Sequence, residues 1–369
     1  MKIALIVGTR PEIIKVSPLI RYCEKKGIEY FILHTGQHYS SNMDKIFFEE
    51  LELPAPKHQL NIKSISPVKQ GAHTGNMLIE IEAILLEESP DVVLVHGDTN
   101  TALAGALSAA KISTTKEYSG RNIKLGHIES GLRSYDRSMP EEINRVIVDH
   151  LSNVLFPPTP GAVSNLEKEG IPSENIVVTG NTIVDAVYEN LEIAERKIDT
   201  LSELKIKKKD YILVTVHRQE SVDVETRLHN IIEALVKVQV EFDLPVIYPM
   251  HPRTSKMIKK FNIIVPETIR IIRPVGFLEF LQLEDNAKLI LTDSGGIQEE
   301  ACILGVPCVT LRNNTERPET VESGANIIAG YSPENILKCA RVMMDKKIKY
   351  NNILGDGNAA KLIIERLQQ

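Results

Sequence analysis

Short apolar runs alternate along the chain with longer stretches in which apolar residues recur at helical spacing. The apolar, β-branched runs that we predict to be strands in the first half are Ile3–Val7, Tyr30–Thr35, Val92–His96, Lys124–His127 and Val154–Phe156. The helix-like stretches among them include Glu12–Lys26, Asn76–Glu88 and Thr101–Lys111. A second series of predicted strands consists of Tyr211–Val216, Val246–Met250, Ile269–Ile272, Leu289–Thr292 and Cys308–Leu311. This alternation indicates an α/β fold, with parallel sheets covered by helices on both faces.

The length of the chain and one polar segment suggest how it is divided. At 369 residues it is too long for one ordinary hydrophobic core, so we expect two domains. The segment Pro157–Gly180 is rich in Pro, Gly, Ser and Asn, which is typical of a passage between domains. Residues Asn358–Leu367 have the pattern of a final amphipathic helix.

Composition narrows the class of protein. With 43% hydrophobic and 25% charged residues, the chain resembles ordinary soluble globular proteins. A net charge of −6 argues against nucleic-acid binding, so the cations for any anionic ligand must be concentrated in one place. We expect no membrane partner, because neither a bilayer-spanning run nor a signal-peptide pattern occurs. The cysteines Cys23, Cys302, Cys308 and Cys339 lack metal-ligand spacing and indicate reduced thiols in a cytoplasmic protein without a metal site.

Polar residues gather directly after the predicted strands. These segments are Gly8–Glu12, Gly36–His38, His96–Thr99, His127–Arg133, His217–Glu220, His251–Arg253 and Asp293–Gly296. One such segment is more often a turn or a helix cap, but seven at equivalent positions are hard to explain as caps alone. Since ligands bind beyond the carboxyl ends of parallel strands, we expect two halves that face one another across a shared cleft.

Asp293–Ala301 is the sharpest of these segments, because a strand ends, two adjacent glycines follow and a helix begins. Glycines allow close backbone approach, and the N–H groups and positive dipole at a helix start suit a phosphate. Ser294 as an N-cap with acids in the first turn explains the same pattern equally well. A carboxylate would repel a phosphate, so Glu299 or Glu300 needs another role, such as accepting both hydroxyls of a ribose.

Several basic side chains are candidates for the same anion. The arginines of Arg312–Glu319 could add positive charge, although a solvated surface loop explains this segment as well. Arg10 and Lys15 follow the first strand without the GxGxxG spacing of a dinucleotide site, and a surface position also explains Lys15. His217 is at a strand end, where a histidine is more often structural, but its neighbour Arg218 makes an anion contact reasonable.

A carboxylate-rich group distinguishes the first half. It consists of Asp98, Glu129, Glu141 and Glu142, with Arg145 nearby in sequence. Clustered carboxylates raise one another's pKa values and so can supply an acid–base pair near neutral pH. A helix start with Pro at its first position and acids in its first turn is the alternative, and it explains Glu142 better than Glu141.

The motifs of the chain resemble those of one family. They read GTRPEIIK (8–15), HGDTNTALAG (96–105), GHIESGLRS (126–134), MPEEINR (139–145), VHRQES (216–221), DSGGIQEEA (293–301) and TERPE (315–319). In these segments, which keep the family's order, the chain is similar to the non-hydrolysing UDP-N-acetylglucosamine 2-epimerases. The resemblance implies the GT-B fold, with two Rossmann-like domains facing across a cleft and a C-terminal helix that crosses back to the first domain. It implies residues 1–172 plus 356–369 as the sugar acid–base side and 173–355 as the UDP side.

The resemblance also implies an activity. Members of the family interconvert UDP-N-acetylglucosamine and UDP-N-acetylmannosamine without a metal or a nicotinamide cofactor. A base removes the proton from C2 while UDP leaves C1, giving a 2-acetamidoglucal, and UDP then adds back as C2 is protonated on the other face. A homodimer and a role in polysaccharide biosynthesis are implied by the family only.

Site residues follow from the resemblance position by position. The implied catalytic groups are Asp98, Glu129, Glu141 and His217. The implied substrate-binding residues are Arg10, Lys15, Arg145, Arg218, Phe280, Ser294, Gly295, Gly296, Glu300 and Arg317. Among these, Phe280 would stack near uracil, and a core phenylalanine on a helix explains it equally well. Which carboxylate acts on which proton does not follow from the sequence.

The chain departs from the family's pattern in three places. HRQES replaces the more usual HR-basic-Glu-Asn, and Ser130 replaces an alanine. Bacterial members bind a second UDP-N-acetylglucosamine as an allosteric activator, and the segment after the second strand is longer here and lacks one glutamine. Gln37, Met43 and Gln70 are the candidates for such a site.

Three other functions compete with epimerisation. A hydrolysing 2-epimerase would release N-acetylmannosamine and UDP, and a GT-B glycosyltransferase would need an acceptor. A non-catalytic nucleotide-sugar sensor would not need Asp98, Glu129 and Glu141 together.

Overall fold

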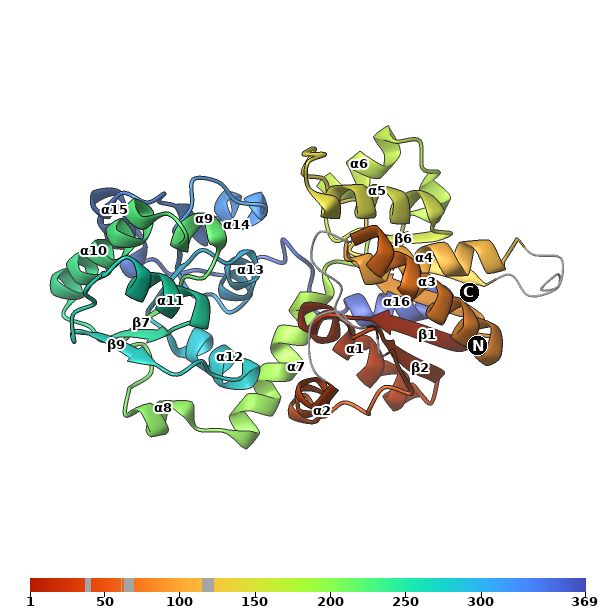
Figure 1. The fold of residues 1–369 in the computed structure, drawn as a ribbon, viewed down its shortest axis with the longest axis horizontal. Coiled ribbons are helices and arrows are strands. Elements are labelled where there is room, and N and C mark those ends of the chain that lie inside the picture. Colours follow the sequence, from red (N-terminus) through yellow and green to blue (C-terminus); the bar gives the residue numbers. More distant parts are fainter. Residues whose placement is uncertain (37–40, 61, 63–69, 115–122) are drawn as a thin grey trace. The chain divides into compact units, whose positions relative to one another are not determined.

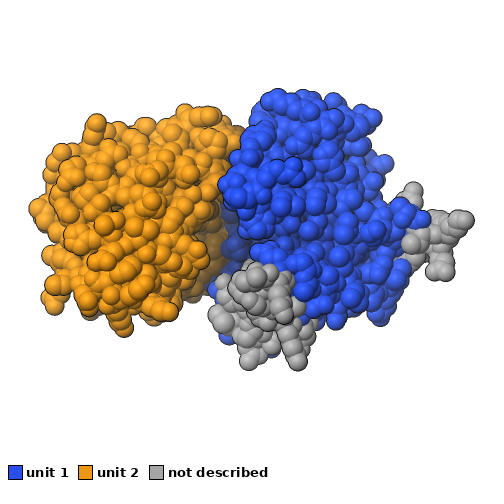
Figure 2. Space-filling model, turned by 45° about the horizontal axis from the view of Figure 1, so that its top comes forward, with its two compact units in different colours: residues 1–186, 354–369 blue, residues 187–353 orange. Residues whose placement is uncertain are grey.

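Two parallel sheets organise the chain in the computed structural model, which describes residues 1–36, 41–60, 62, 70–114 and 123–369 (Figure 1). Each sheet is the centre of one unit. Unit 1 comprises Met1–Ala186 and Leu354–Gln369, and unit 2 comprises Val187–Ile353 (Figure 2).

The sheet of unit 1 has the strand order of a Rossmann domain. Its strands are β1 (Lys2–Val7), β2 (Glu29–His34), β3 (His58–Gln59), β4 (Val92–His96), β5 (Lys124–Ile128) and β6 (Val154–Phe156). They are parallel and lie in the order β3-β2-β1-β4-β5-β6. The order reverses between β1 and β4, which is where ligands bind in open α/β sheets.

Helices cover the unit 1 sheet. They are α1 (Arg10–Lys26), α2 (Ser41–Glu50), α3 (Gln70–Glu88), α4 (Asn100–Ile112), α5 (Pro140–Leu151), α6 (Pro160–Lys168), the 3-10 turn η2 (Ser173–Asn175) and α16 (Ala359–Leu367). Helix α4 packs on strands β1, β4 and β5, with α3 and α5 beside it. The last helix, α16, lies against α1 (Figure 1). The predicted C-terminal helix that crosses back to the first domain is therefore confirmed.

The sheet of unit 2 repeats this topology. Its strands are β7 (Ile212–Thr215), β8 (Val246–Pro249), β9 (Ile269–Ile272), β10 (Leu289–Thr292), β11 (Cys308–Thr310) and β12 (Asn326–Ile328). Their order is β12-β11-β10-β7-β8-β9, again parallel, so the reversal falls between β7 and β10. The prediction of an α/β fold with two Rossmann-like sheets is confirmed.

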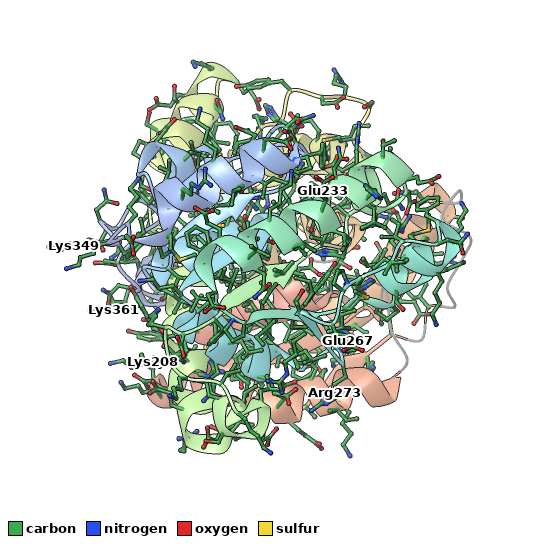
Figure 3. The ribbon with its side chains drawn as sticks, turned by 90° about the vertical axis from the view of Figure 1, so that its left-hand side faces the viewer. Lys208, Glu233, Glu267, Arg273, Lys349 and Lys361 are labelled. Carbon is green, nitrogen blue, oxygen red and sulfur yellow. The ribbon has the colours of Figure 1, made fainter. Side chains whose placement is uncertain are left out.

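Helices cover both faces of the second sheet. After α7 (Thr182–Lys197), which begins in unit 1, the helices are α8 (Thr200–Leu204), α9 (Gln219–Val222), α10 (Glu225–Phe242), α11 (Pro252–Lys260), α12 (Phe277–Asn286), α13 (Gly295–Ile303), α14 (Pro318–Glu322) and α15 (Pro333–Met344). Along β7, Ile212 and Val214 pack towards α10 and α15, while Leu213 packs in the apolar cluster shared with α12 and α13. This period of two buries the strand on both faces. Charged side chains such as Lys208 and Arg273 project from the surface of the unit (Figure 3).

Two strands were not predicted. The edge strands β3 and β12 contain only two and three residues. Runs this short show neither the apolar alternation nor the flanking turns by which a strand is recognised in sequence.

The division between the units falls later in the chain than the boundary expected at residues 172 and 173. It lies within α7, after Ala186, and the chain returns at Leu354. The intervening residues are held to unit 1, because the Val177 N–H donates to Leu155 O and the Asn181 N–H donates to Leu354 O. Backbone hydrogen bonds therefore place the polar passage in the first unit.

Within the described ranges of the chain, no helix is both long enough and apolar enough to cross a membrane.

Candidate active site

Glu12 links the loops at the reversal point of unit 1. Its carboxylate accepts hydrogen bonds from the Gly8 and Thr9 N–H groups at 2.9 and 2.7 Å, which caps α1. The Thr99 hydroxyl, from the loop after β4, donates to the same carboxylate at 2.6 Å. Burial is the main reason that the pKa of Glu12 is raised. The sequence did not point to Glu12 as a site residue, although its spacing from Thr9 is that of a capping box.

Arg10, the first residue of α1, lies beside this cap. Its guanidinium carbon is 5.3 Å from the centroid of the Phe47 ring. The predicted contact of Arg10 with a nucleotide or phosphate stays a prediction.

Glu129 is held by two cationic or polar groups from neighbouring elements. Its Oε2 lies 2.6 Å from Lys15 Nζ and 3.1 Å from His96 Nε2, and only 7% of its side chain is exposed. The residue has a φ of +65°, in the left-handed region that is unfavourable for most side chains. Lys15, which we predicted as a phosphate contact, is thus the counter-ion of a predicted catalytic carboxylate.

A buried chain of polar groups supports the loop that carries Glu129. His127 Nδ1 lies 2.6 Å from Asp149 Oδ1, while its Nε2 donates to the Gly97 carbonyl at 2.8 Å. Asp149 also accepts the Gly131 N–H at 3.1 Å and pairs with Arg133 at 2.7 Å. Burial alone would raise the pKa of Asp149, but His127 and Arg133 outweigh this effect and lower it. The network therefore fixes the loops after β4 and β5 together.

The local sequence indicates only one of these two supporting residues. His127 stands in a polar strand-end segment, whereas Asp149 lies near the end of α5, and nothing local shows that it would be fully buried.

Arg145 joins the two remaining acidic positions of unit 1. Its guanidinium binds the carboxylates of Asp98 and Glu142. Glu142 is only 4% exposed and accepts the backbone N–H groups of Ser134 and Tyr135, both at 2.9 Å. Burial alone would raise the pKa of Glu142, but these hydrogen bonds and Arg145 outweigh it and lower the pKa. Glu142 thus has a structural role in the first turn of α5, where its carboxylate holds the preceding loop at Ser134 and Tyr135.

Glu141 differs from its neighbour. It is exposed in the first turn of α5, and no hydrogen bond or ion pair of its side chain is found within the described residues. Of the adjacent pair, Glu141 is the one whose carboxylate is available to a substrate.

In unit 2, Asp293 has the linking position that Glu12 has in unit 1. It follows β10, is fully buried and accepts the N–H groups of His217 and Arg218 at 3.0 and 2.9 Å. Its carboxylate is also 3.4 Å from His217 Nδ1. Both predicted residues after β7 are therefore anchored by the first residue after β10.

The hydrogen bonds at the start of α13 distinguish the two explanations of its sequence, a serine cap and a phosphate site. Ser294 is the N-cap residue, but its hydroxyl makes no capping hydrogen bond, and its N–H donates to Thr292 Oγ1 at 2.9 Å. An ordinary serine cap is therefore not formed. The N–H groups at Gly295 and Gly296 begin the helix without that cap, which is the arrangement that favours an anion.

Arginines surround this helix start. Arg218 Nη1 lies 3.4 Å from Glu316 Oε1, and a Cβ built on Gly295 would be 3.6 Å from Arg218 Nη2. Arg312 is 2% exposed and also pairs with Glu316, at 2.8 Å. Hydrogen bonding from Arg312 is the main reason that the pKa of Glu316 falls to about 2. Of the two explanations of Arg312–Glu319, the structure therefore favours added positive charge over a solvated loop, because Arg312 and Glu316 form ordered ion pairs beside the predicted phosphate site.

The two glutamates of α13 have different surroundings. Glu299 lies 2.8 Å from Arg317 Nε and has 3% of its side chain exposed. This pair explains how one glutamate can lie near a predicted phosphate site, and it gives Arg317 a carboxylate partner. Glu300 is 7% exposed, and its predicted ribose contact stays a prediction.

Phe280 on α12 is partly buried against the cluster that includes Leu283 and Ile290, which agrees with core packing, and its predicted stacking near uracil stays a prediction. Among the allosteric candidates, Gln37 and the Met43 side chain lie outside the described residues. Gln70 begins α3, and its side-chain oxygen accepts from Asn100 Nδ2 at 3.2 Å.

Comparisons with known proteins agree with this arrangement. The family model for UDP-N-acetylglucosamine 2-epimerase matches residues 21–368. The chain is 53% identical to UDP-N-acetylglucosamine 2-epimerase of Methanocaldococcus jannaschii, over 100% of this chain and 99% of the relative. It is 41% identical to UDP-2,3-diacetamido-2,3-dideoxy-D-glucuronate 2-epimerase of Pseudomonas aeruginosa, over 100% and 99%.

A solved structure is similar over the same length. The crystal structure of the Methanocaldococcus jannaschii UDP-GlcNAc 2-epimerase in complex with UDP-GlcNAc and UDP matches with a TM-score of 0.85 and 53% identity, covering 100% of this chain and 99% of that one. From the matched motifs, the paired Rossmann-like sheets and these full-length similarities, the chain belongs to the UDP-N-acetylglucosamine 2-epimerase family.

Proposed function

We propose that this protein interconverts UDP-N-acetylglucosamine and UDP-N-acetylmannosamine by inverting C2 of the sugar. One observation carries the proposal: equivalent strand ends of two sheets with the same order hold carboxylates in unit 1 and an uncapped helix start in unit 2. The carboxylates suit proton transfer, and the N–H groups of the helix start suit a diphosphate. The names of full-length relatives support the same reaction.

The reaction proceeds by elimination and re-addition. A base takes the proton from C2, the electrons of that C–H bond form the C1–C2 double bond, and the C1–O bond breaks towards UDP. The products of this half-reaction are 2-acetamidoglucal and UDP. UDP then adds to C1 as an acid protonates C2 from the opposite face, so no atom is gained or lost overall.

The residues divide these tasks according to their chemistry. Asp98, Glu129 and Glu141 exchange protons with the sugar, and Lys15 and Arg145 hold two of these carboxylates in place. Ser294, Gly295 and Gly296 bind the departing diphosphate through helix-start N–H groups, with Arg218 adding charge. Glu300 accepts the ribose hydroxyls.

The test follows the products of UDP-N-acetylglucosamine by NMR in heavy water. We expect UDP-N-acetylmannosamine with deuterium at C2, formed without an acceptor. Free N-acetylmannosamine as the main product would replace this proposal with a hydrolysing epimerase. Turnover that requires an added acceptor and leaves C2 protonated would indicate a glycosyltransferase, and unchanged sugar would indicate a sensor.

A second substrate is favoured by one comparison. The Pseudomonas aeruginosa relative is named as an epimerase of UDP-2,3-diacetamido-2,3-dideoxy-D-glucuronate and is 41% identical over the whole chain. Measuring kcat/KM for both nucleotide sugars under the same conditions distinguishes the two. A larger kcat/KM for the glucuronate would reassign the substrate and keep the 2-epimerisation chemistry.

We further propose that the protein acts in the cytoplasm as a homodimer and supplies UDP-N-acetylmannosamine for polysaccharide biosynthesis. A stripe of exposed apolar residues on α3 supports the dimer: Ile79 is 70% exposed, Leu86 is 45% exposed, and Ala72 and Ala83 are exposed at matching positions. Spacings of seven, four and three residues separate Ala72, Ile79, Ala83 and Leu86, so the four side chains lie along one side of the helix. An exposed apolar stripe of this kind is typical of a surface that packs against another helix.

A further inference from the structure

Two carboxyl groups meet inside unit 2, on adjacent helices. Glu284 on α12 is fully buried, and Glu300 on α13 is 7% exposed. The two helices pack against each other. No N–H or O–H group among the described residues donates to either carboxyl oxygen of Glu284. The carboxyl of Glu300 is the neighbouring group that interacts with it most strongly.

The surroundings of Glu284 offer no compensation for a negative charge. The Tyr211 hydroxyl donates to the Leu283 carbonyl at 2.5 Å, so its hydrogen is already used. The buried thiol of Cys308 is a second neighbour, and burial is the main reason that its pKa is raised. No ion pair of Glu284 with a lysine, arginine or histidine is found in the part of the chain that the structure describes. An ionised carboxylate in such a place costs several kcal/mol.

Two carboxylates cannot hydrogen-bond to one another unless one of them carries a proton. Burial, followed by the charge and hydrogen bonding of Glu300, raises the pKa of Glu284 well above its ordinary value of 4.5. The proton belongs on Glu284, since this side chain is the more deeply buried of the two.

We propose that Glu284 is a neutral acid that donates a hydrogen bond to the carboxylate of Glu300 and so positions Glu300 to accept the ribose hydroxyls of UDP. This inference rests on the proposed ribose contact of Glu300. A carboxylate that binds two adjacent hydroxyls must stay ionised and must keep its plane fixed. A neutral donor behind it serves both needs, whereas a second anion would repel it. Glu284 is therefore a positioning residue and does not itself touch the nucleotide.

The test compares the binding of UDP and 2′-deoxy-UDP by calorimetry at neutral pH. Glu284→Gln keeps a donor towards Glu300, so the ratio of the two affinities should match the wild type. Glu284→Leu fills the site without a donor. The ratio of the affinity for UDP to that for 2′-deoxy-UDP should then fall roughly tenfold, the value of one hydrogen bond to a charged group. An unchanged ratio in a folded Glu284→Leu variant would overturn the proposal. Asp285→Asn, on the same helix, is the matched control and should keep the wild-type ratio.

Glu300→Gln separates this inference from the proposed function. If Glu300→Gln leaves the ratio unchanged, Glu300 does not bind the ribose, and the proposed contact fails. If Glu300→Gln lowers the ratio while Glu284→Leu does not, only the role of Glu284 fails.

A second measurement does not depend on the folding of the leucine variant. The infrared difference spectrum between wild type and Glu284→Gln at neutral pH should contain the carbonyl band of a protonated carboxylic acid. A difference spectrum with only carboxylate bands would show that Glu284 is ionised and would overturn the proposal.

Discussion

Lys15 on α1 binds the carboxylate of Glu129 at 2.6 Å, across 114 residues of sequence. Both side chains are mostly buried, at 12% and 7% exposed. The conformation of a proposed catalytic carboxylate therefore depends on a cation from another element.

Lys15→Met should destabilise the protein and slow the reaction. It removes the lysine of a buried ion pair with Glu129, and the loss of one partner of such a pair typically costs about 3 kcal/mol. Urea unfolding measures this loss, and the double variant Lys15→Met, Glu129→Gln should regain part of it because the buried negative charge that Lys15 balanced is gone. A double variant less stable than Lys15→Met alone would show that the pair does not behave as a buried ion pair.

The carboxylate variants Asp98→Asn, Glu129→Gln and Glu141→Gln should each lower kcat by roughly 10²- to 10⁴-fold, the usual contribution of a general acid or base. The measurement is the rate of epimerisation, with circular dichroism as the check on folding. Asp91→Asn is the control, because this carboxylate precedes β4, at the opposite end of the sheet from the proposed site, and binds the Lys2 N–H. Wild-type rates in all three variants would rule out the assignment.

Asp149→Asn should lower kcat more than it changes KM. The substitution weakens the support of His127 and of the Gly131 N–H, so the loop that carries Glu129 shifts. Small displacements of a catalytic group cost roughly 10- to 100-fold in rate. His150→Gln is the neighbouring control, since that side chain is 49% exposed. Equal kcat values for the two variants would mean that the buried network does not position Glu129.

Ile79→Glu should convert the proposed dimer to a monomer. A charge in the apolar stripe of α3 would be buried against another helix, whereas on a free surface it would be harmless. Sedimentation equilibrium gives the mass of wild type and variant, and Glu80→Gln beside the stripe serves as control. A wild-type monomer would refute the dimer, and a dimeric Ile79→Glu would place the interface elsewhere.

The stability of the wild type relative to Glu284→Gln should fall as the pH rises. The pKa of Glu284 is raised on folding, so its contribution is fully present below the ordinary value of 4.5 and is lost as pH rises through the folded-state pKa. Between these values the folded state binds one more proton than the unfolded state. Urea unfolding at a series of pH values measures the difference, and a difference that grows with pH would contradict this assignment.

Much of the fold could be predicted because the signals are local. Ile212 and Val214 alternate with Leu213 in the strand that they form, and Pro140 begins α5 as its position before two acids suggested. The strand ends that carry Asp98 and Ser294 were identified for the same reason.

The contacts within the site could not be predicted because they depend on residues far apart in sequence. Nothing near Asp149 indicates that it will meet His127, and nothing near Glu284 indicates that it will meet Glu300. The capping of α13 could not be predicted for another reason: a serine at a helix start can donate, accept or do neither, and the folded structure shows that the Ser294 hydroxyl makes no capping hydrogen bond.

The return of α16 to unit 1 has a consequence for synthesis of the chain. Its buried residues Ile363, Ile364 and Leu367 pack with the first unit, and Asp185 accepts the N–H groups that begin this helix. A ribosome makes all of unit 2 before it makes these residues. The first unit therefore leaves the ribosome with an uncovered apolar surface and completes its core only when the last turn of the polypeptide has emerged.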